Sequence, residues 1–243
     1  MVTNNEIKRV RSLLQKKYRN QYGQFVVEGV KLVKELIASR FEVVSVFATL
    51  EVAGELSGIR DIKIVSNEQI NRMSGLTTSP GILAVAAIPE ARSPNDFSGW
   101  TVVLDDLNDP GNVGTILRNA DWFGIHRVVL SPKSVDAFNP KVVQASMGAI
   151  FRVEVYTTGV EDFIKHAAMS GIPVFAADMQ GVPIDDLEFP DTGVLIMGSE
   201  SHGVNPELQP MIDGKITIPG RGGAESLNVA VAMAVICSRL PIE

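Results

Sequence analysis

The chain has 243 residues, of which 45% are hydrophobic and 21% charged, and its formal net charge is −6 at pH 7. A chain of this length can hold two domains or one large one, and the composition is ordinary for a globular protein. It has no run near the roughly 20 apolar residues that a membrane span needs. With three histidines and only Cys237, it offers no zinc-type ligand cluster and no internal disulfide. We expect a metal-free cytoplasmic protein with no membrane partner.

The charge is unevenly distributed along the chain. Residues 1–95 carry 13 Lys and Arg against 9 Asp and Glu, whereas residues 96–243 carry 9 against 19. Between Lys8 and Arg19 there are six basic residues and no acidic one. Two interpretations stay open: a solvated helix face, or an N-terminal domain that contacts phosphates beside an acidic domain.

The first ninety residues alternate between helical and extended patterns. Apolar residues recur at helical spacing near the N-terminus, and the apolar runs that follow are short enough for strands. We expect helices over 6–20, 30–39 and 68–76, and strands over 24–29, 42–49, 62–66 and 81–89. The pattern predicts a small α/β domain. Residues 90–99 combine Pro, Ser, Asn and Gly without an apolar period, which predicts a linker.

The second half alternates more plainly between apolar strands and helix-like segments. We expect strands over 101–106, 127–131, 151–157, 173–178, 193–200 and 215–219, and a final helix from Glu225 to Arg239. Near-continuous apolar strands that alternate with helices predict a parallel sheet covered on both faces.

A parallel α/β sheet raises the possibility of a nucleotide enzyme or a hydrolase, and the sequence lacks the motifs of both. It contains no G-x-x-x-x-G-K-[ST] phosphate loop. Residues 220–225 have Glu225 at the third glycine of a dinucleotide fingerprint, and they follow the last strand instead of the first. In 198–203, Glu200 occupies the serine position of a nucleophile elbow, and His202 alone is predicted to be a loop residue.

Three polar, glycine-rich loops remain, and each follows an apolar strand. They span residues 108–124, 197–204 and 218–230. Loops at the carboxyl ends of parallel strands bind ligands in open α/β sheets. Because glycine removes the side chain, these loops expose backbone amides and carbonyls. They suit an adenosine-like ligand that is bound mainly by main chain.

In sequence order, these loops resemble the three motifs of the SpoU (TrmH-type) branch of the SPOUT RNA 2′-O-ribose methyltransferases. The resemblance covers about 101–240, and the stretch from Arg11 through residues 25–35 resembles the ribosomal-protein-like RNA-binding domain common in this branch. The matching residues are Pro110, Asn112, Gly114, Arg118 and Ala120 in the first motif, Gly198, Glu200 and Gly203 in the second, and Ile218, Pro219, Gly222 and Glu225–Val229 in the third.

The resemblance implies the fold and the partners. It implies an α/β fold with a C-terminal parallel-sheet SPOUT domain over 98–243 and a small RNA-binding domain over 1–92. In this family the C-terminal segment threads through a loop to form a deep trefoil knot that binds S-adenosyl-L-methionine. The family also implies a homodimer with the site near the interface, and it explains why the last helix is apolar all round.

The match to the family motifs also implies which residues form the site. The backbone around Gly198, Ile218, Pro219 and Leu227 is expected to hold the cofactor, and Ser226 and Asn228 to face the reacting centre. Ser226 has an alternative role as the N-cap of the last helix. The inferred reaction moves a methyl group to a ribose 2′-hydroxyl, so the site needs an oriented in-line attack and a proton acceptor.

Arg118 is the residue on which we expect catalysis to depend most. A guanidinium suits the phosphate beside the target ribose and can stabilise a developing oxyanion, but it holds its proton too firmly to act as a base. Glu200 or the RNA phosphate is the expected proton acceptor, although Glu200 has an open structural alternative. Asn112 is expected to brace the first loop or to contact the 2′-hydroxyl.

Three departures from the family motifs bear on substrate preference. Asp109 stands where Asn is usual, Ser199 replaces the Asn of the second motif, and Gly220 replaces a common Met. None of them removes the arginine, the glutamate or the Ser-Leu-Asn triplet, so we expect an active enzyme.

Several alternatives stay open at this stage. Ribosomal RNA with a guanosine target is favoured by analogy over tRNA, and a non-catalytic RNA-binding or ribosome-assembly factor is the main competitor. A nucleotide-dependent oxidoreductase is weakened by the missing fingerprint. Tyr22 and Phe25 are candidates for base stacking, whereas Trp122 and Phe123 are expected in the core or at a dimer contact.

Overall fold

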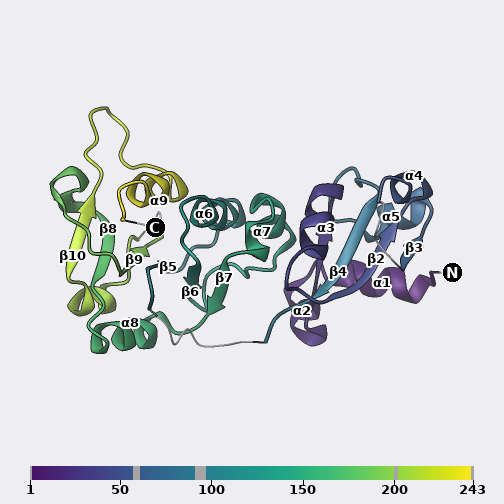
Figure 1. Ribbon diagram of the computed structural model, residues 1–243, viewed down its shortest axis with the longest axis horizontal. Coiled ribbons are helices and arrows are strands. Elements are labelled where there is room, and N and C mark those ends of the chain that lie inside the picture. The colour runs from purple at the N-terminus through teal and green to yellow at the C-terminus, as the bar shows by residue number, and fades with distance from the viewer. Residues whose placement is uncertain (1, 57–60, 91–96, 200–201, 242–243) are drawn as a thin grey trace. The chain divides into compact units, whose positions relative to one another are not determined.

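The computed structural model describes residues 2–56, 61–90, 97–199 and 202–241 (Figure 1). The chain divides into two compact units, and each is described by itself. Unit 1 comprises Met1–Glu90 and Phe138–Phe151, and unit 2 comprises Ala91–Ala137 and Arg152–Glu243. The domain limits of 1–92 and 98–243 stay a prediction, and the unit division differs from them in assigning Phe138–Phe151 to the first unit.

Unit 1 is built on a four-stranded sheet in the order β1-β4-β2-β3, in which β4 runs antiparallel to β1 and β2. Its strands are β1 (Gln24–Glu28), β2 (Val43–Ala48), β3 (Ile62–Ile64) and β4 (Ile82–Ala87). Its helices are α1 (Asn4–Ser12), α2 (Lys16–Tyr22), α3 (Val30–Ile37), α4 (Leu50–Ala53), α5 (Asn67–Met73) and α7 (Pro140–Ala145), with the 3-10 helix η1 (Ala149–Phe151). The sheet and its helices confirm the expected small α/β fold.

The single helix expected over 6–20 is two helices, α1 and α2. The chain leaves α1 after Ser12, and Gln15 is extended before α2 begins. The Arg19 side chain is 1% exposed and donates from Nη1 to the Leu13 carbonyl at 2.9 Å, which fixes the turn between the helices. One of the six basic residues in this segment is therefore a structural residue.

An aromatic cluster in unit 1 joins segments far apart in the sequence. The ring centroid of Phe25 lies 4.8 Å from that of Phe138 and 5.9 Å from that of Phe41, and Phe41 lies 5.5 Å from Phe151. Phe25 is 0% exposed. The hypothesis that Phe25 stacks on RNA bases is wrong, because its ring is enclosed in the core.

Unit 2 contains a six-stranded sheet in the order β10-β8-β9-β5-β6-β7, and all neighbouring strands are parallel. Its strands are β5 (Trp100–Leu104), β6 (Arg127–Leu130), β7 (Glu154–Thr157), β8 (Val174–Pro183), β9 (Gly193–Met197) and β10 (Gly214–Thr217). Its helices are α6 (Pro110–Trp122), α8 (Val160–Met169) and α9 (Val229–Cys237), with the 3-10 helices η2 (Ile184–Asp186) and η3 (Pro206–Met211).

The burial of the strands fits a parallel sheet with both faces covered. Every residue of β5, β6 and β9 is buried, as expected for strands covered on both faces. Helix α8 contributes Phe163, Ile164 and Ala167 to the core cluster on one side. The predicted parallel α/β sheet is confirmed. The trefoil knot is not decided by the strand order, and it stays a prediction.

The last helix begins later than expected. Helix α9 starts at Val229 and is capped by Asn228, so the alternative role of Ser226 as N-cap is wrong. Figure 1 shows the loop between β10 and α9, in yellow, extending away from the sheet before α9 returns beside α6. None of the helices in the described part of the chain is long and apolar enough to cross a bilayer.

Candidate active site

A cavity of about 800 Å³ lies in unit 2 where three neighbouring strands approach or reach their carboxyl ends. Its walls come from β8 at residues 177–179, from the end of β9 at 197–199, and from the segment 216–227 in and after β10. Helix α9 adds Val229, Ala232 and Ile236. The last two of the three glycine-rich loops therefore meet at one edge of the sheet, as expected for an open α/β fold.

The loop after β9 closes tightly on itself. Ser199 donates its backbone N–H to the Gly203 carbonyl at 3.1 Å, and Gly203 donates to the Ser199 carbonyl at 2.8 Å. A Cβ atom at Gly198 would lie 2.2 Å from the Gly203 carbonyl carbon and 2.3 Å from the Val204 nitrogen. Only glycine fits at position 198, because the main chain occupies the space of a side chain. Glu200, the predicted proton acceptor, lies outside the described residues.

The first and third motifs are joined by a hydrogen bond between two asparagines. Asn228 accepts from the backbone N–H groups of Ala230 and Val231, at 3.0 and 3.3 Å, and its Nδ2 donates to Oδ1 of Asn112 at 2.9 Å. Asn112 lies in the first turn of α6, where its N–H donates to the N-cap Asp109 at 2.8 Å. The N-termini of α6 and α9 are thus neighbours.

The predicted site residues fall into three groups. The predicted cofactor-binding residues Gly198, Ile218, Pro219 and Leu227 all line the cavity, together with Ser226. Asn228 lies between two lining residues and holds Asn112. Arg118 is exposed, does not line the cavity, and makes no hydrogen bond or ion pair with the residues that the structure describes. The roles of these residues stay predictions.

Sequence reasoning missed the wall that β8 provides. Asp178 and Met179 line the cavity, and Arg221 lines it from the loop between β10 and α9. Lys215 Nζ lies 2.8 Å from the Asp178 carboxylate, and this hydrogen bond, with help from backbone N–H groups, lowers the pKa of Asp178. The missed signal was position: Asp178 ends the predicted strand 173–178, at the edge where the glycine-rich loops lie.

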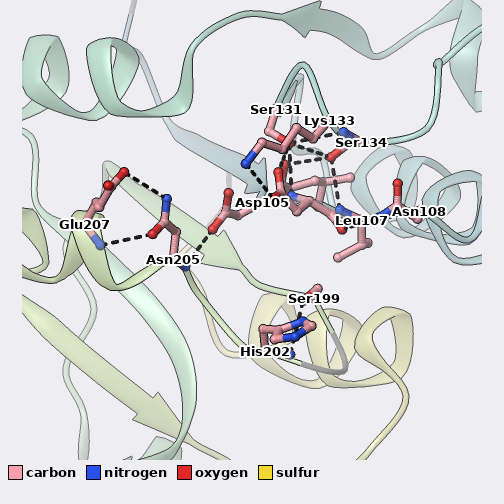
Figure 2. A network of polar contacts seen from close by, with 12 residues as sticks. Asp105, Leu107, Asn108, Ser131, Lys133, Ser134, Ser199, His202, Asn205 and Glu207 are labelled. Atoms are coloured by element: carbon pink, nitrogen blue, oxygen red, sulfur yellow. Dashed lines mark hydrogen bonds and ion pairs between the residues drawn. The ribbon is translucent and has the colours of Figure 1, made fainter.

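A polar network holds the loop after β9 against the end of β5 (Figure 2). Asp105 is 5% exposed and accepts the backbone N–H of Asn205 at 2.8 Å. Beside it, Ser131 donates to the Asp106 carboxylate at 2.8 Å, and Ser134 accepts the N–H of Leu107 at 3.1 Å. Burial raises the pKa of Asp105, partly offset by the Asn205 hydrogen bond. Asp105 is therefore a bracing residue of the site.

Acidic, histidine and cysteine side chains do not gather into a metal-binding group anywhere in the described ranges. The single Cys237 is buried on α9, and burial raises the pKa of its thiol to about 12. Cys237 is therefore protonated at neutral pH and packs as an apolar residue.

Comparison with known proteins assigns the chain to a family. Residues 99–238 match the SpoU rRNA methylase family, and residues 4–84 match the MRM3-like substrate binding domain. The chain is 30% identical over 240 residues to the 23S rRNA (guanosine(2553)-2′-O)-methyltransferase RlmP of Bacillus subtilis, with 98% of this chain and 96% of that protein covered.

Two solved structures share the whole fold. A TrmH-family protein from Porphyromonas gingivalis is 38% identical, with a TM-score of 0.91 and 98% of each chain covered. The AdoMet-bound rRNA methyltransferase of Sinorhizobium meliloti is 27% identical, with a TM-score of 0.86 and coverage of 98% of this chain and 95% of that one.

The fold and the family match therefore define an RNA methyltransferase that uses S-adenosyl-L-methionine. The chain belongs to the SpoU rRNA methylase family. The predicted family, fold class, enzyme class and cofactor are confirmed.

Substitution of Gly198 by alanine tests the loop after β9. We expect Gly198→Ala to lower the affinity for S-adenosylmethionine by at least about tenfold, because the added Cβ forces the backbone of Gly203 and Val204 away. Isothermal titration calorimetry measures this change. Gly223→Ala is the matched control, since a Cβ there meets nothing within 4 Å. Equal affinities of the two variants would contradict a binding role for this loop.

Substitution of Asp105 by asparagine tests whether burial raises the pKa of this carboxyl. A carboxyl whose pKa is raised by folding favours the folded state most when it is protonated, below its unfolded pKa of about 3.9, and less as the pH rises through the folded pKa. Asp105→Asn keeps an oxygen acceptor and lacks this pH-dependent loss. We expect the stability of the variant, relative to the wild type, to increase between pH 3.5 and pH 7 in urea unfolding. The exposed Asp191→Asn is the control, and a flat difference for Asp105→Asn would contradict the prediction.

Proposed function

We propose that the chain transfers a methyl group from S-adenosylmethionine to the 2′-hydroxyl of a guanosine ribose in ribosomal RNA. The observation that carries the proposal is the cavity in which the four predicted cofactor-binding residues and Ser226 converge. The RNA class and the base are supported by the relative in Bacillus subtilis, which covers nearly the whole chain. Since ribosomal RNA is cytoplasmic in bacteria, the cytoplasm is the proposed compartment.

The cavity fits the proposed cofactor in size and in chemistry. Its volume of about 800 Å³ lies within the range of about 300–1,000 Å³ for pockets that bind ligands of this size. Main chain at Gly198, Ile218 and Leu227 offers N–H and C=O groups to an adenosine, and Met197 and Ile236 provide apolar contacts. When bound, S-adenosylmethionine supplies a methyl group activated by the sulfonium.

We assign orientation of the RNA to Arg118 and to the helix N-termini. The Arg118 guanidinium is exposed and has no partner among the described residues, so it can form a bidentate contact with a phosphate. The adjoining N-termini of α6 and α9 carry partial positive charge, which favours an anionic ligand nearby. Ser226 and Asn228 face the ribose, Asn112 braces Asn228, and Glu200 or an RNA phosphate accepts the proton.

The second part of the proposal is a homodimer that completes the site. A groove between α6 and α9 is lined by Val231, Ala234 and Val235, and Val231 is 50% exposed. Helical spacing places Trp122 on the face of α6 that carries the groove residues Thr115 and Asn119. Trp122 is 84% exposed, which rules out a place in the core of this chain. Such an apolar face is expected at an interface between copies. Arg118 does not line the cavity of its own chain, which favours action on the cavity of the partner.

Labelled S-adenosylmethionine and unmodified 23S rRNA test the proposed reaction. We expect the wild type to incorporate label as 2′-O-methylguanosine, identified by nuclease digestion and mass spectrometry. Arg118→Ala is expected to lose activity by at least about a hundredfold, because a transition-state contact is removed, while its calorimetric affinity for the cofactor is unchanged. Lys165→Ala, on the exposed side of α8, is the control.

The outcomes separate the alternatives. Label on tRNA alone would replace the proposed substrate. Cofactor binding without label on any RNA would leave the non-catalytic RNA-binding factor as the better account.

Disruption of the groove tests the homodimer. We expect Val231→Lys to shift the protein from dimer to monomer in sedimentation, with a dissociation constant raised at least about tenfold, because a charge is buried against an apolar face. Met169→Lys, which changes an 88% exposed residue on α8, is the control. A wild-type monomer at assay concentrations would overturn the dimer proposal.

Mixing two impaired variants tests whether the site is shared, at a cofactor concentration too low to occupy Gly198→Ala. If Arg118 acts on the partner's cavity, an Arg118→Ala chain mixed with a Gly198→Ala chain forms heterodimers with one complete site, and methylation rises above that of either variant alone. If Arg118 acts within its own chain, neither chain of the heterodimer is complete and methylation stays at the level of the separate variants.

A further inference from the structure

Unit 1 has a cleft of its own, with a volume of about 520 Å³, at the junction of α1, the α1–α2 turn and α5. Its lining includes three cations and three other polar residues, and no acidic residue among those that the structure describes. They are Lys8, Arg11 and Arg72, with Ser12, Gln15 and Tyr18. An open cleft with this lining attracts an anionic ligand.

The three cations of the cleft form no ion pair with a carboxylate in the part of the chain that the structure describes. Lys8 makes no ion pair with any carboxylate that the structure describes, and Arg72 donates to the neutral amide oxygen of Asn4 at 3.2 Å. Arg11 donates to the carbonyl of Ser74. Other cations of the same unit are paired, as Lys63 is with Glu6 at 2.5 Å. The positive charge of the cleft is therefore left for a ligand to balance.

Arg11 is held in place by Ser74, which is itself bound to a buried carboxylate. Glu28 is 5% exposed, and it accepts the hydroxyl of Ser74 and the backbone N–H of Gly75, the latter at 2.8 Å. Since Ser74 also accepts from Arg11, the guanidinium is anchored through Ser74 to the core. A fixed guanidinium loses little entropy when it binds a phosphate.

One wall of the cleft is the ring of Tyr18, which stacks on a second tyrosine ring beside two cations. The Tyr18 and Tyr22 rings stack with centroids 6.3 Å apart and planes 15° from parallel. The Arg9 guanidinium lies 5.1 Å from the Tyr22 centroid, and the Lys17 ammonium lies 5.7 Å from that of Tyr18. These stacking and cation–π contacts orient Tyr18. A nucleobase can pack against the Tyr18 ring because every base has a π-face.

We propose that this cleft binds one unpaired nucleotide of the RNA substrate together with its flanking phosphates. Lys8, Arg11 and Arg72 contact the phosphates, and Tyr18 packs against the base. The combination of cations that have no described carboxylate partner with an aromatic wall favours single-stranded RNA over a duplex, whose stacked bases cannot reach a ring. The inference deepens the proposed function, since it rests on RNA as the substrate, and it names the surface by which unit 1 recognises that RNA.

Fluorescence anisotropy of the full-length chain with a labelled 12-nucleotide oligouridine tests the cleft. Lys8→Glu and Arg72→Glu are expected to weaken binding at least about tenfold and to lower the slope of log K against log salt by about 0.7 for each phosphate that the variant no longer neutralises. Lys34→Glu, on the exposed face of α3, changes the charge of the same unit equally and is expected to leave binding near wild type. Variants that bind like Lys34→Glu would overturn the proposal.

The aromatic contact has a separate readout. An oligonucleotide with 2-aminopurine is expected to lose fluorescence on binding to the wild type and to keep it with Tyr18→Leu, which retains bulk and removes the ring. Tighter binding of a 16-base-pair RNA duplex than of the oligouridine would overturn the assignment to an unpaired nucleotide. Circular dichroism shows whether each variant is folded. If Tyr18→Leu does not fold, the anisotropy measurement on Lys8→Glu, which changes an exposed residue, still tests the cleft.

Failure of this inference can be told apart from failure of the proposed function. Calorimetry with S-adenosylmethionine is expected to give wild-type affinity for all cleft variants, because the cofactor cavity lies in unit 2. Methylation of 23S rRNA with unchanged RNA affinity in the cleft variants would reject the cleft and keep the enzyme. RNA binding abolished in the cleft variants, with no methylation by the wild type, would keep the cleft and reject the enzyme.

Discussion

One side-chain amide, that of Asn228, joins the N-termini of two helices at the edge of the parallel sheet. Its oxygen caps α9 and its nitrogen bonds to Asn112, 116 residues earlier in the chain. The two helices are further joined by Asn119, which donates to the Ala230 carbonyl at 2.8 Å. Because Asn228 caps α9 and bonds to Asn112, this contact holds the end of the preceding loop, and that loop forms one wall of the cavity. An alanine at 228 would lose a cap, a link between motifs and a predicted site residue at once, which is why its separate roles are hard to divide by mutation.

The three motif loops have room for side-chain change at some positions and not at others. The three departures from the family motifs illustrate this. Asp109 caps α6 through its side chain, and the Ser199 hydroxyl accepts the backbone N–H of His202 at 3.3 Å. Gly220 has open space around it. Gly198 has no such freedom, because the neighbouring backbone lies where its side chain would be. At these positions, the room for a Cβ atom limits which residues fit more than their chemical type does.

Much of the architecture could be predicted from the sequence, since buried parallel strands give continuous apolar runs with clear ends. The residues expected to meet at the carboxyl edge followed from that pattern and from the family resemblance. The predictions that were wrong concerned local details or side chains whose roles depend on residues far away in the sequence. Both Ser226 and Asn228 are residue types that cap helices, and the bond of Asn228 to the distant Asn112 is visible only in the fold. Phe25 follows a basic segment, yet its burial depends on Phe138, 113 positions later. Arg19 resembles a phosphate ligand in sequence, and its buried bond to Leu13 is visible only in the fold.

Unit 1 takes part of its core from the middle of the chain. Phe138 and Phe151 pack against Phe25 and Phe41, and the segment that carries them lies within residues 99–238, which match the methylase family. A gene fragment that ends near codon 92 would encode the strands of unit 1 without these aromatic neighbours. Recombination at that boundary would therefore not transfer unit 1 to another protein with its whole core. Its inheritance is tied to that of the catalytic region, and substitutions in the two coding segments are expected to be selected together.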